Sequence, residues 1–159
     1  QFSVSIENRK QRYSELFFQW KALLEGETDE IACFANTTAA LVETFGFFWV
    51  GFYRVIGEEL VLGPFQGPIA CTRIRKGRGV CGASWLRNET TLVPNVDEFP
   101  GHIACSSASK SEIVIPLRDQ EGVVVAVLDI DSNKLDDFSL EDQVQLENLC
   151  FELQNHLYA

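Results

Sequence analysis

The first third of the chain carries apolar side chains at helical spacing. A first apolar stripe ends near Leu24, and a second runs from Ile31 to Phe45 with the same three-and-four-residue spacing. Between them, Gly26 can end one helix and Asp29 can cap the next. We therefore expect residues 1–45 to form a helical N-terminal part.

From Phe47 onward the apolar positions alternate with a period of two, which is typical of strands. Phe47–Val55 and Leu60–Phe65 flank a glycine turn and predict one hairpin, and residues 112–118 and 122–131 predict another. Residues 66–111 hold most of the Gly, Pro, Ser and Cys, with a short helix expected after Gly82. Such a loop-rich region between regular elements often carries the functional site.

The chain returns to helical spacing over residues 139–157, where Ser139 can cap the N-terminus and Asp142 follows three residues later. Helices, then antiparallel strands, then a helix indicate an α+β fold with a mainly antiparallel sheet flanked by helices. The length of 159 residues suits one domain, so we expect a single domain over 1–159, with the sheet and its loops at 47–132.

Charge and cysteine content narrow the function classes. The net charge is −10, which disfavours nucleic-acid binding, and no apolar run is long enough to span a membrane. The one basic cluster is Arg73, Arg75, Lys76 and Arg78. Five cysteines are too few for a secreted disulfide scaffold, and no signal peptide is visible, so a cytoplasmic location is expected.

The five cysteines divide by context. Cys33 and Cys150 lie on apolar helical faces and are expected in the core. Cys71, Cys81 and Cys105 fall in the loop-rich region, where exposure and redox reactivity are plausible.

Two other motifs receive structural interpretations. Gly77–Gly82 matches G-x-G-x-x-G, but its surroundings are antiparallel, so it predicts a glycine-rich turn and no dinucleotide site. The two histidines are not paired with each other or with cysteines at metal-ligand spacing, so no metal site is predicted. His102 stands three residues before Cys105, but a surface histidine is the favoured interpretation over a Cys–His pair.

The last predicted hairpin gathers carboxylates. If Arg118 pairs with Val123, Glu112 lies opposite Asp129, and Asp131 shares their face. Like charges facing each other are destabilising. This face is either exposed to solvent or a site where clustering raises a carboxyl pKa, giving a general acid and a cation-binding charge.

The first predicted strand places Trp49, Gly51 and Tyr53 on one face. Two aromatic rings flanking a glycine are compatible with core packing and with the wall of a small pocket. The pattern leaves both alternatives open.

Six motifs in order carry a resemblance to a known family: Phe48–Tyr53, Leu62–Gly67, Gly77–Gly82, Phe99–Cys105, Ser111–Pro116 and Val127–Asp131. From about residue 30 onward the chain resembles the free methionine-R-sulfoxide reductases, which are stand-alone GAF-domain enzymes. The resemblance implies a GAF-like fold with a six-stranded sheet and reduction of free methionine-(R)-S-oxide. It also implies no metal or organic cofactor, a thioredoxin-like protein as reductant and a homodimer.

The resemblance also implies roles for particular residues. Cys105 corresponds to the catalytic cysteine, Cys71 to the resolving cysteine, and Cys81 to a third cysteine able to form disulfides. The implied substrate-pocket residues are Trp49, Tyr53, Glu112, Asp129 and Asp131.

Two departures from the family pattern stand near these motifs. Ser106 replaces the acidic residue that often follows the catalytic cysteine, and Trp85 stands where small residues are usual. Two alternatives to the reductase are a GAF regulatory module that binds a small ligand, and a thiol-based redox sensor or peroxidase.

Overall fold

Helices and strands follow one another in the order that the sequence predicts. The computed structural model describes residues 8–102 and 108–159. The helices are α1 (Arg9–Leu24), α2 (Glu30–Phe45), α3 (Gly79–Arg87) and α4 (Leu140–Tyr158), with a 3-10 turn, η2, at Val96–Glu98. The strands are β1 (Trp49–Ile56), β2 (Glu59–Gln66), β3 (Arg73–Arg75), β4 (Thr91–Val93), β5 (Ser111–Arg118) and β6 (Val124–Ser132).

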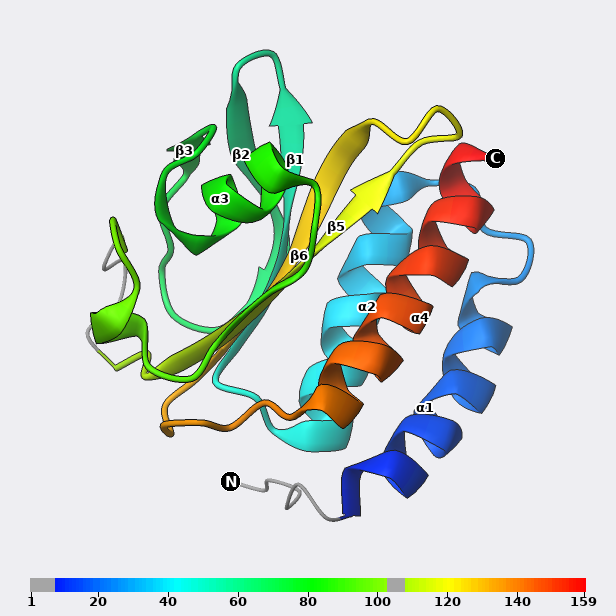
Figure 1. Ribbon diagram of the computed structural model, residues 1–159. Coiled ribbons are helices and arrows are strands. Elements are labelled where there is room, and N and C mark those ends of the chain that lie inside the picture. Colours follow the sequence, from blue (N-terminus) through cyan, green and yellow to red (C-terminus); the bar gives the residue numbers. More distant parts are fainter. Residues whose placement is uncertain (1–7, 103–107) are drawn as a thin grey trace.

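These strands form one six-stranded sheet in the order β3-β2-β1-β6-β5-β4, with every neighbouring pair antiparallel. In Figure 1, α1, α2 and α4 lie together on one side of the sheet and α3 lies on the other. This arrangement confirms the predicted α+β class with flanking helices. Among the described residues, no helix is long and apolar enough to cross a membrane.

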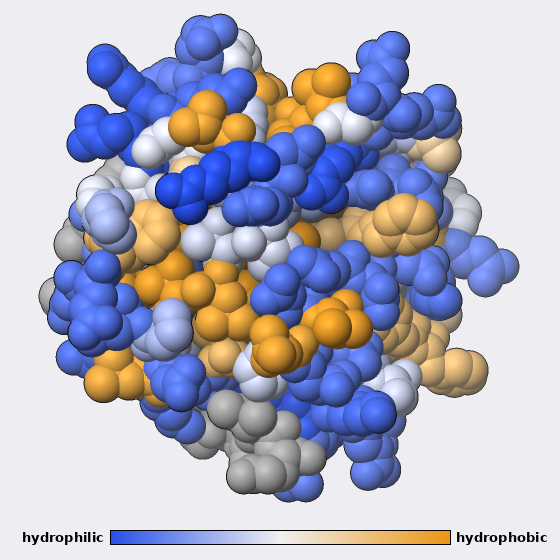
Figure 2. Space-filling model, in the orientation of Figure 1, coloured by the Kyte–Doolittle hydropathy of each residue, from blue (hydrophilic) through white to orange (hydrophobic). Residues whose placement is uncertain are grey.

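The period-two pattern of the central strands separates two cores. Val50, Phe52 and Ile130 point to the side of α1, α2 and α4, where they join the larger cluster of buried side chains. That cluster also contains Cys33 and Cys150, which confirms their predicted place in the core. On the face seen in Figure 2, polar side chains divide the remaining exposed apolar residues into separate patches.

The register of the β5–β6 hairpin differs from the predicted one. Glu112 lies opposite Asp131, and not opposite Asp129 as the sequence suggested. The shift amounts to two residues, and strand side chains alternate with a period of two. Glu112, Asp129 and Asp131 therefore still share one face, as predicted.

The shift comes from the turn and from an adjoining irregularity. The Gly122 amide donates a 3.1 Å hydrogen bond to the Asp119 carbonyl, and Gly122 has a φ of 83°, which favours glycine. The strands consequently begin with Arg118 opposite Val124, and a second irregularity next to Arg118 adds another residue. Neither feature follows from counting outward along two regular strands.

The predicted glycine-rich turn over Gly77–Gly82 is only partly confirmed, because Gly77 lies in a turn and Gly79–Gly82 form the first turn of α3. The Gly77 amide donates to the Gly82 carbonyl at 2.9 Å, and a Cβ on Gly82 would lie 2.5 Å from the Arg75 carbonyl oxygen. The prediction that the helix starts after Gly82 is wrong, because α3 begins at Gly79 and places Cys81 in its first turn.

A buried network of charged side chains ties α1 to α4. The Arg9 guanidinium lies 3.0 Å from Asp142 and 2.9 Å from Asp137, and the Tyr13 hydroxyl donates to Asp142 at 2.7 Å. Asp142 also completes the capping box with Ser139, as the sequence predicted for the start of this helix. One carboxylate thus serves an ion pair, a phenol and a helix cap.

We predict that Asp142→Ala lowers the free energy of unfolding by about 3–5 kcal/mol, because Arg9 and Tyr13 stay buried with a partner removed. Glu147→Ala, on an exposed position of the same helix, should change it by no more than about 0.5 kcal/mol. Urea unfolding of both variants measures the difference. Equal stability of the two would contradict a structural role for this network.

Candidate active site

Three adjacent strands align the predicted site residues in rows on the α3 side of the sheet. In one row Trp49 of β1 lies opposite Asp131 of β6, which lies opposite Glu112 of β5. In the next row Gly51 lies opposite Asp129. The pairing of β6 between β1 and β5 therefore places all three carboxyl groups on one face, beside the Trp49 ring.

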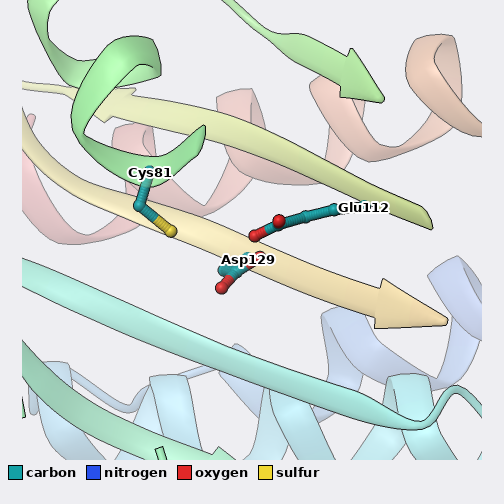
Figure 3. A group of neighbouring side chains, drawn as sticks. All are labelled: Cys81, Glu112 and Asp129. Carbon is teal, nitrogen blue, oxygen red and sulfur yellow. The ribbon is translucent and has the colours of Figure 1, made fainter. Parts of the chain in front are cut away.

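These carboxyl groups lie under α3. Glu112 and Asp129 are each only 6% exposed, so the solvent-exposed alternative for this face is wrong. Figure 3 shows Cys81 extending from α3 toward Glu112 on β5 and Asp129 on β6. One potential ligand atom from each of the three lies within 4.8 Å of the others.

The environment favours protonated carboxyl groups. Burial, followed by the charges of Asp129 and Asp131, raises the pKa of Glu112 well above its usual value. Burial likewise raises the pKa of Asp131 well above its usual value, while hydrogen bonds from Glu112 and Cys81 limit the rise at Asp129. A hydrogen bond between two carboxyl groups needs a proton on one of them. The cluster therefore retains protons that isolated carboxylates would lose.

Aromatic rings close one side of the same space. The Trp49 ring stacks on Phe65 at 5.3 Å and on Tyr53 at 6.1 Å between centroids. The indole nitrogen donates to the Pro68 carbonyl at 3.0 Å and the Tyr53 hydroxyl to the Cys71 carbonyl at 2.9 Å. Because both polar groups have partners in the protein, the rings offer their carbon faces to a ligand.

These groups line one small pocket with about 60 Å³ of open space. Its lining includes every predicted substrate residue. Trp49 and Tyr53 are buried in the smaller core cluster and also line the pocket, so both interpretations of this face hold. Residues that the sequence analysis did not assign to the site also line the pocket: Phe48, Ile69, Ala70, Ile74, Arg78, Gly79, Val80, His102 and Ser109.

His102 is the most informative of these additions. It is half-buried and lines the pocket, so it keeps some of the exposure expected of a surface histidine but also lies close to the carboxyl cluster. The available signal was its position three residues before Cys105. Cys105 itself lies outside the described residues.

The other two predicted redox cysteines differ from each other. Cys71 is half-buried and disulfide-bonded. Cys81 is a free thiol only 4% exposed, and burial together with Asp129, Glu112 and Asp131 raises its pKa well above the usual value. The expectation that Cys81 is exposed in a loop is therefore wrong. A thiol in this state is a weak nucleophile.

Comparison with known proteins agrees with this fold. The family model for the GAF domain matches residues 27–157. The chain is 56% identical to "GAF domain-containing protein A" of Dictyostelium discoideum, covering 96% of each protein. It is 45% identical to the free methionine-R-sulfoxide reductase of Escherichia coli K12, covering 94% of this chain and 91% of that one.

A solved structure also resembles this chain. The free methionine-R-sulfoxide reductase of Neisseria meningitidis, in complex with its substrate, superposes with a TM-score of 0.90 and 48% identity, covering 98% of this chain and 93% of that one. The GAF-like fold is thus confirmed. On sequence, fold and relatives together, this chain belongs to the free methionine-R-sulfoxide reductase family of GAF domains.

Proposed function

We propose that this protein reduces free L-methionine-(R)-S-oxide to L-methionine. The observation that carries the proposal is the cluster of buried Glu112 and Asp129 with half-buried Asp131, beside the Trp49 ring. A sulfoxide oxygen must accept a proton or a strong hydrogen bond before its sulfur can be attacked, and buried carboxyl groups with raised pKa supply that proton at neutral pH. Relatives named for this substrate support the same assignment.

The pocket suits a free amino acid in two further respects. Negative charge remaining on the cluster would pair with the substrate ammonium group. The carbon face of Trp49 would pack against the S-methyl group, since its nitrogen is already bonded to the Pro68 carbonyl. In this arrangement Glu112, with Asp129 or Asp131, holds the shared proton on the sulfoxide oxygen.

We assign the nucleophile to Cys105. Its thiolate attacks the protonated sulfoxide, the S–O bond of the sulfoxide breaks, and the oxygen with its proton is transferred to the Cys105 sulfur. Methionine leaves, and Cys105 becomes a sulfenic acid. The Cys71 thiol then condenses with the sulfenic acid, releasing water and forming a disulfide. A dithiol protein reduces this disulfide by exchange and is itself oxidised. Two thiols are thus oxidised for each sulfoxide reduced, and Cys81 is a second thiol able to exchange into the disulfide.

We further propose that a thioredoxin-like protein of acidic surface supplies the electrons. Cys71 is followed by β3, whose Arg73 and Arg75 are exposed, and then by the exposed Lys76 and Arg78. This is the basic cluster of an otherwise acidic chain. Local positive charge next to Cys71 would guide an acidic partner to the disulfide.

The first experiment measures consumption of each epimer of free L-methionine sulfoxide with thioredoxin recycling. We expect turnover of the R epimer only, and its loss in Cys105→Ser. Cys150→Ala, which alters a thiol in the opposite core, should keep activity. No turnover of either epimer, with thioredoxin shown to be active, would contradict the proposal and favour a ligand-binding GAF module.

A second prediction concerns the proton donor. Glu112→Gln should lower kcat/KM by about 100-fold or more, because the amide cannot give the sulfoxide a proton. Glu121→Gln, at the exposed tip of the same hairpin, is the matched control and should leave the rate unchanged. In the wild type the rate should fall as pH rises through the elevated pKa of the cluster. The variant should lack this fall.

The same variant separates chemistry from folding. Because the Glu112 pKa is raised in the fold, the native state binds a proton that the unfolded chain releases near its ordinary pKa. Wild-type stability therefore declines as pH rises toward the folded pKa. Glu112→Gln should lessen this decline, and Asp131, whose pKa is also raised, should keep part of it. Relative to the wild type, the variant should therefore be more stable at about pH 8 than at about pH 5. If Glu112→Gln were less stable than the wild type at both pH values, its lower reduction rate would be due to misfolding.

A third prediction tests the reductant surface. Arg73→Glu with Arg75→Glu should raise KM for thioredoxin by about tenfold at low salt and leave KM for the sulfoxide unchanged. Lys10→Glu with Lys21→Glu makes the same charge change on α1, across the sheet from α3. Equal effects of the two pairs would show that only the total charge of the protein matters.

A further inference from the structure

Cys81, Glu112 and Asp129 bring a thiol and two carboxyl groups together from three elements, α3, β5 and β6 (Figure 3). Their ligand atoms lie within 4.8 Å of one another and all three side chains are buried. We propose that these three side chains form a binding site for Zn²⁺, and that the bound ion closes the pocket to substrate. The sequence analysis did not predict this site, because Cys81 is far from the other two residues along the chain.

The donor set favours zinc over the common hard cations. Zn²⁺ is bound by Cys sulfur together with carboxylate oxygen, usually with four ligands, whereas Mg²⁺ and Ca²⁺ prefer oxygen alone. Three protein ligands leave a fourth position for water. One thiolate and two carboxylates offset the charge of a divalent ion and leave one negative charge, so burial of the ion is compensated.

An independent observation points to a missing ligand at this place. The Oδ1 atom of Asp129 is buried and has no hydrogen-bond partner among the described residues. A buried carboxylate oxygen without a partner is destabilising, and a cation is one group that can satisfy it. Asp129 also lines the pocket, so an ion can reach it from there.

The ligands need little rearrangement to close on an ion. Glu112 and Asp129 stand on adjacent, fully paired strands, and Cys81 is held in the first turn of α3. When Zn²⁺ binds, the Cys81 thiol and any protonated carboxyl group release their protons to solvent, and no oxidation occurs. The same bonds would protect the thiol from oxidation.

The effect on catalysis rests on the function proposed above. Glu112 and Asp129 cannot hold a sulfoxide proton and coordinate zinc at the same time. Zinc and methionine sulfoxide should therefore exclude one another, with zinc raising KM for the sulfoxide. Binding of the ion itself does not depend on that function.

The test uses Co²⁺ as a spectroscopic probe on the full chain, freed of metal and kept reduced. We expect a near-ultraviolet thiolate-to-cobalt charge-transfer band in the wild type and in Cys150→Ala, which retains all three ligands. Cys81→Ala should lose the band. Asp129→Asn and Glu112→Gln should keep it and weaken Co²⁺ binding by at least about tenfold. Zn²⁺ should displace the cobalt.

No band in the wild type, or an equal band in Cys81→Ala, would overturn the proposal. Thermal unfolding of each variant shows whether a lost band is due to misfolding. If Cys81→Ala misfolds, the two carboxyl variants decide whether the site exists. Unchanged Co²⁺ affinity in both of them would also overturn the proposal. Sulfoxide turnover measured in the presence of a metal chelator tests the proposed reductase activity separately. A chain that binds cobalt but does not reduce the sulfoxide would refute the reductase function and leave the metal site standing.

Discussion

The antiparallel pairing of β6 between β1 and β5 is the constraint on which the site depends. It sets Asp131 between Trp49 and Glu112, and Asp129 beside Gly51. Like charges so placed repel one another, and burial under α3 increases the cost of ionising them. The strands keep this arrangement because their opposite face contributes Phe52, Ile130 and their neighbours to the larger core. Packing on one face thus stabilises an unfavourable arrangement on the other.

Two acidic clusters of this chain differ in how their negative charge is compensated. Asp142 and Asp137 both contact the Arg9 guanidinium, which offsets one of their two negative charges, and the cluster stabilises the junction of α1 and α4. Glu112, in contrast, hydrogen-bonds to Asp129 and Asp131. The first arrangement fixes structure, whereas the second keeps protons available, as expected where stability is given up for chemistry.

The sequence predicts the faces of this protein better than its registers. Period-two alternation places Glu112, Asp129 and Asp131 on one face of the sheet for every register that differs from the predicted one by an even number of residues. The pairing of Glu112 with Asp131 depends on the turn at Gly122 and on an adjoining irregularity, which are local backbone features without a distinct pattern in side-chain hydropathy. The predicted sheet face of each carboxyl group is therefore correct although the predicted register is wrong.

Positions set by tertiary contacts could not be predicted in this way. Cys81 stands in a segment rich in glycine, which favours a loop, but the close approach of Gly82 to the Arg75 carbonyl allows α3 to begin earlier and to cover the sheet. His102 lines the pocket but lies in a segment whose hydropathy pattern predicts no helix or strand. The Arg9 contacts likewise join residues more than a hundred positions apart.

The position of Cys81 connects the chemistry of the pocket with its redox cycle. Its thiol contacts the carboxyl cluster, and its raised pKa keeps it protonated while that cluster holds a proton. A buried neutral thiol is a poor nucleophile, so under the proposed function Cys81 would not compete with Cys105 for the sulfoxide. Under the proposed function, exchange of Cys81 into a disulfide would require this thiol to lose its proton and become accessible. Under the proposed function, α3 would cover the carboxyl groups during sulfoxide reduction and hold the Cys81 thiol in its weakly nucleophilic state.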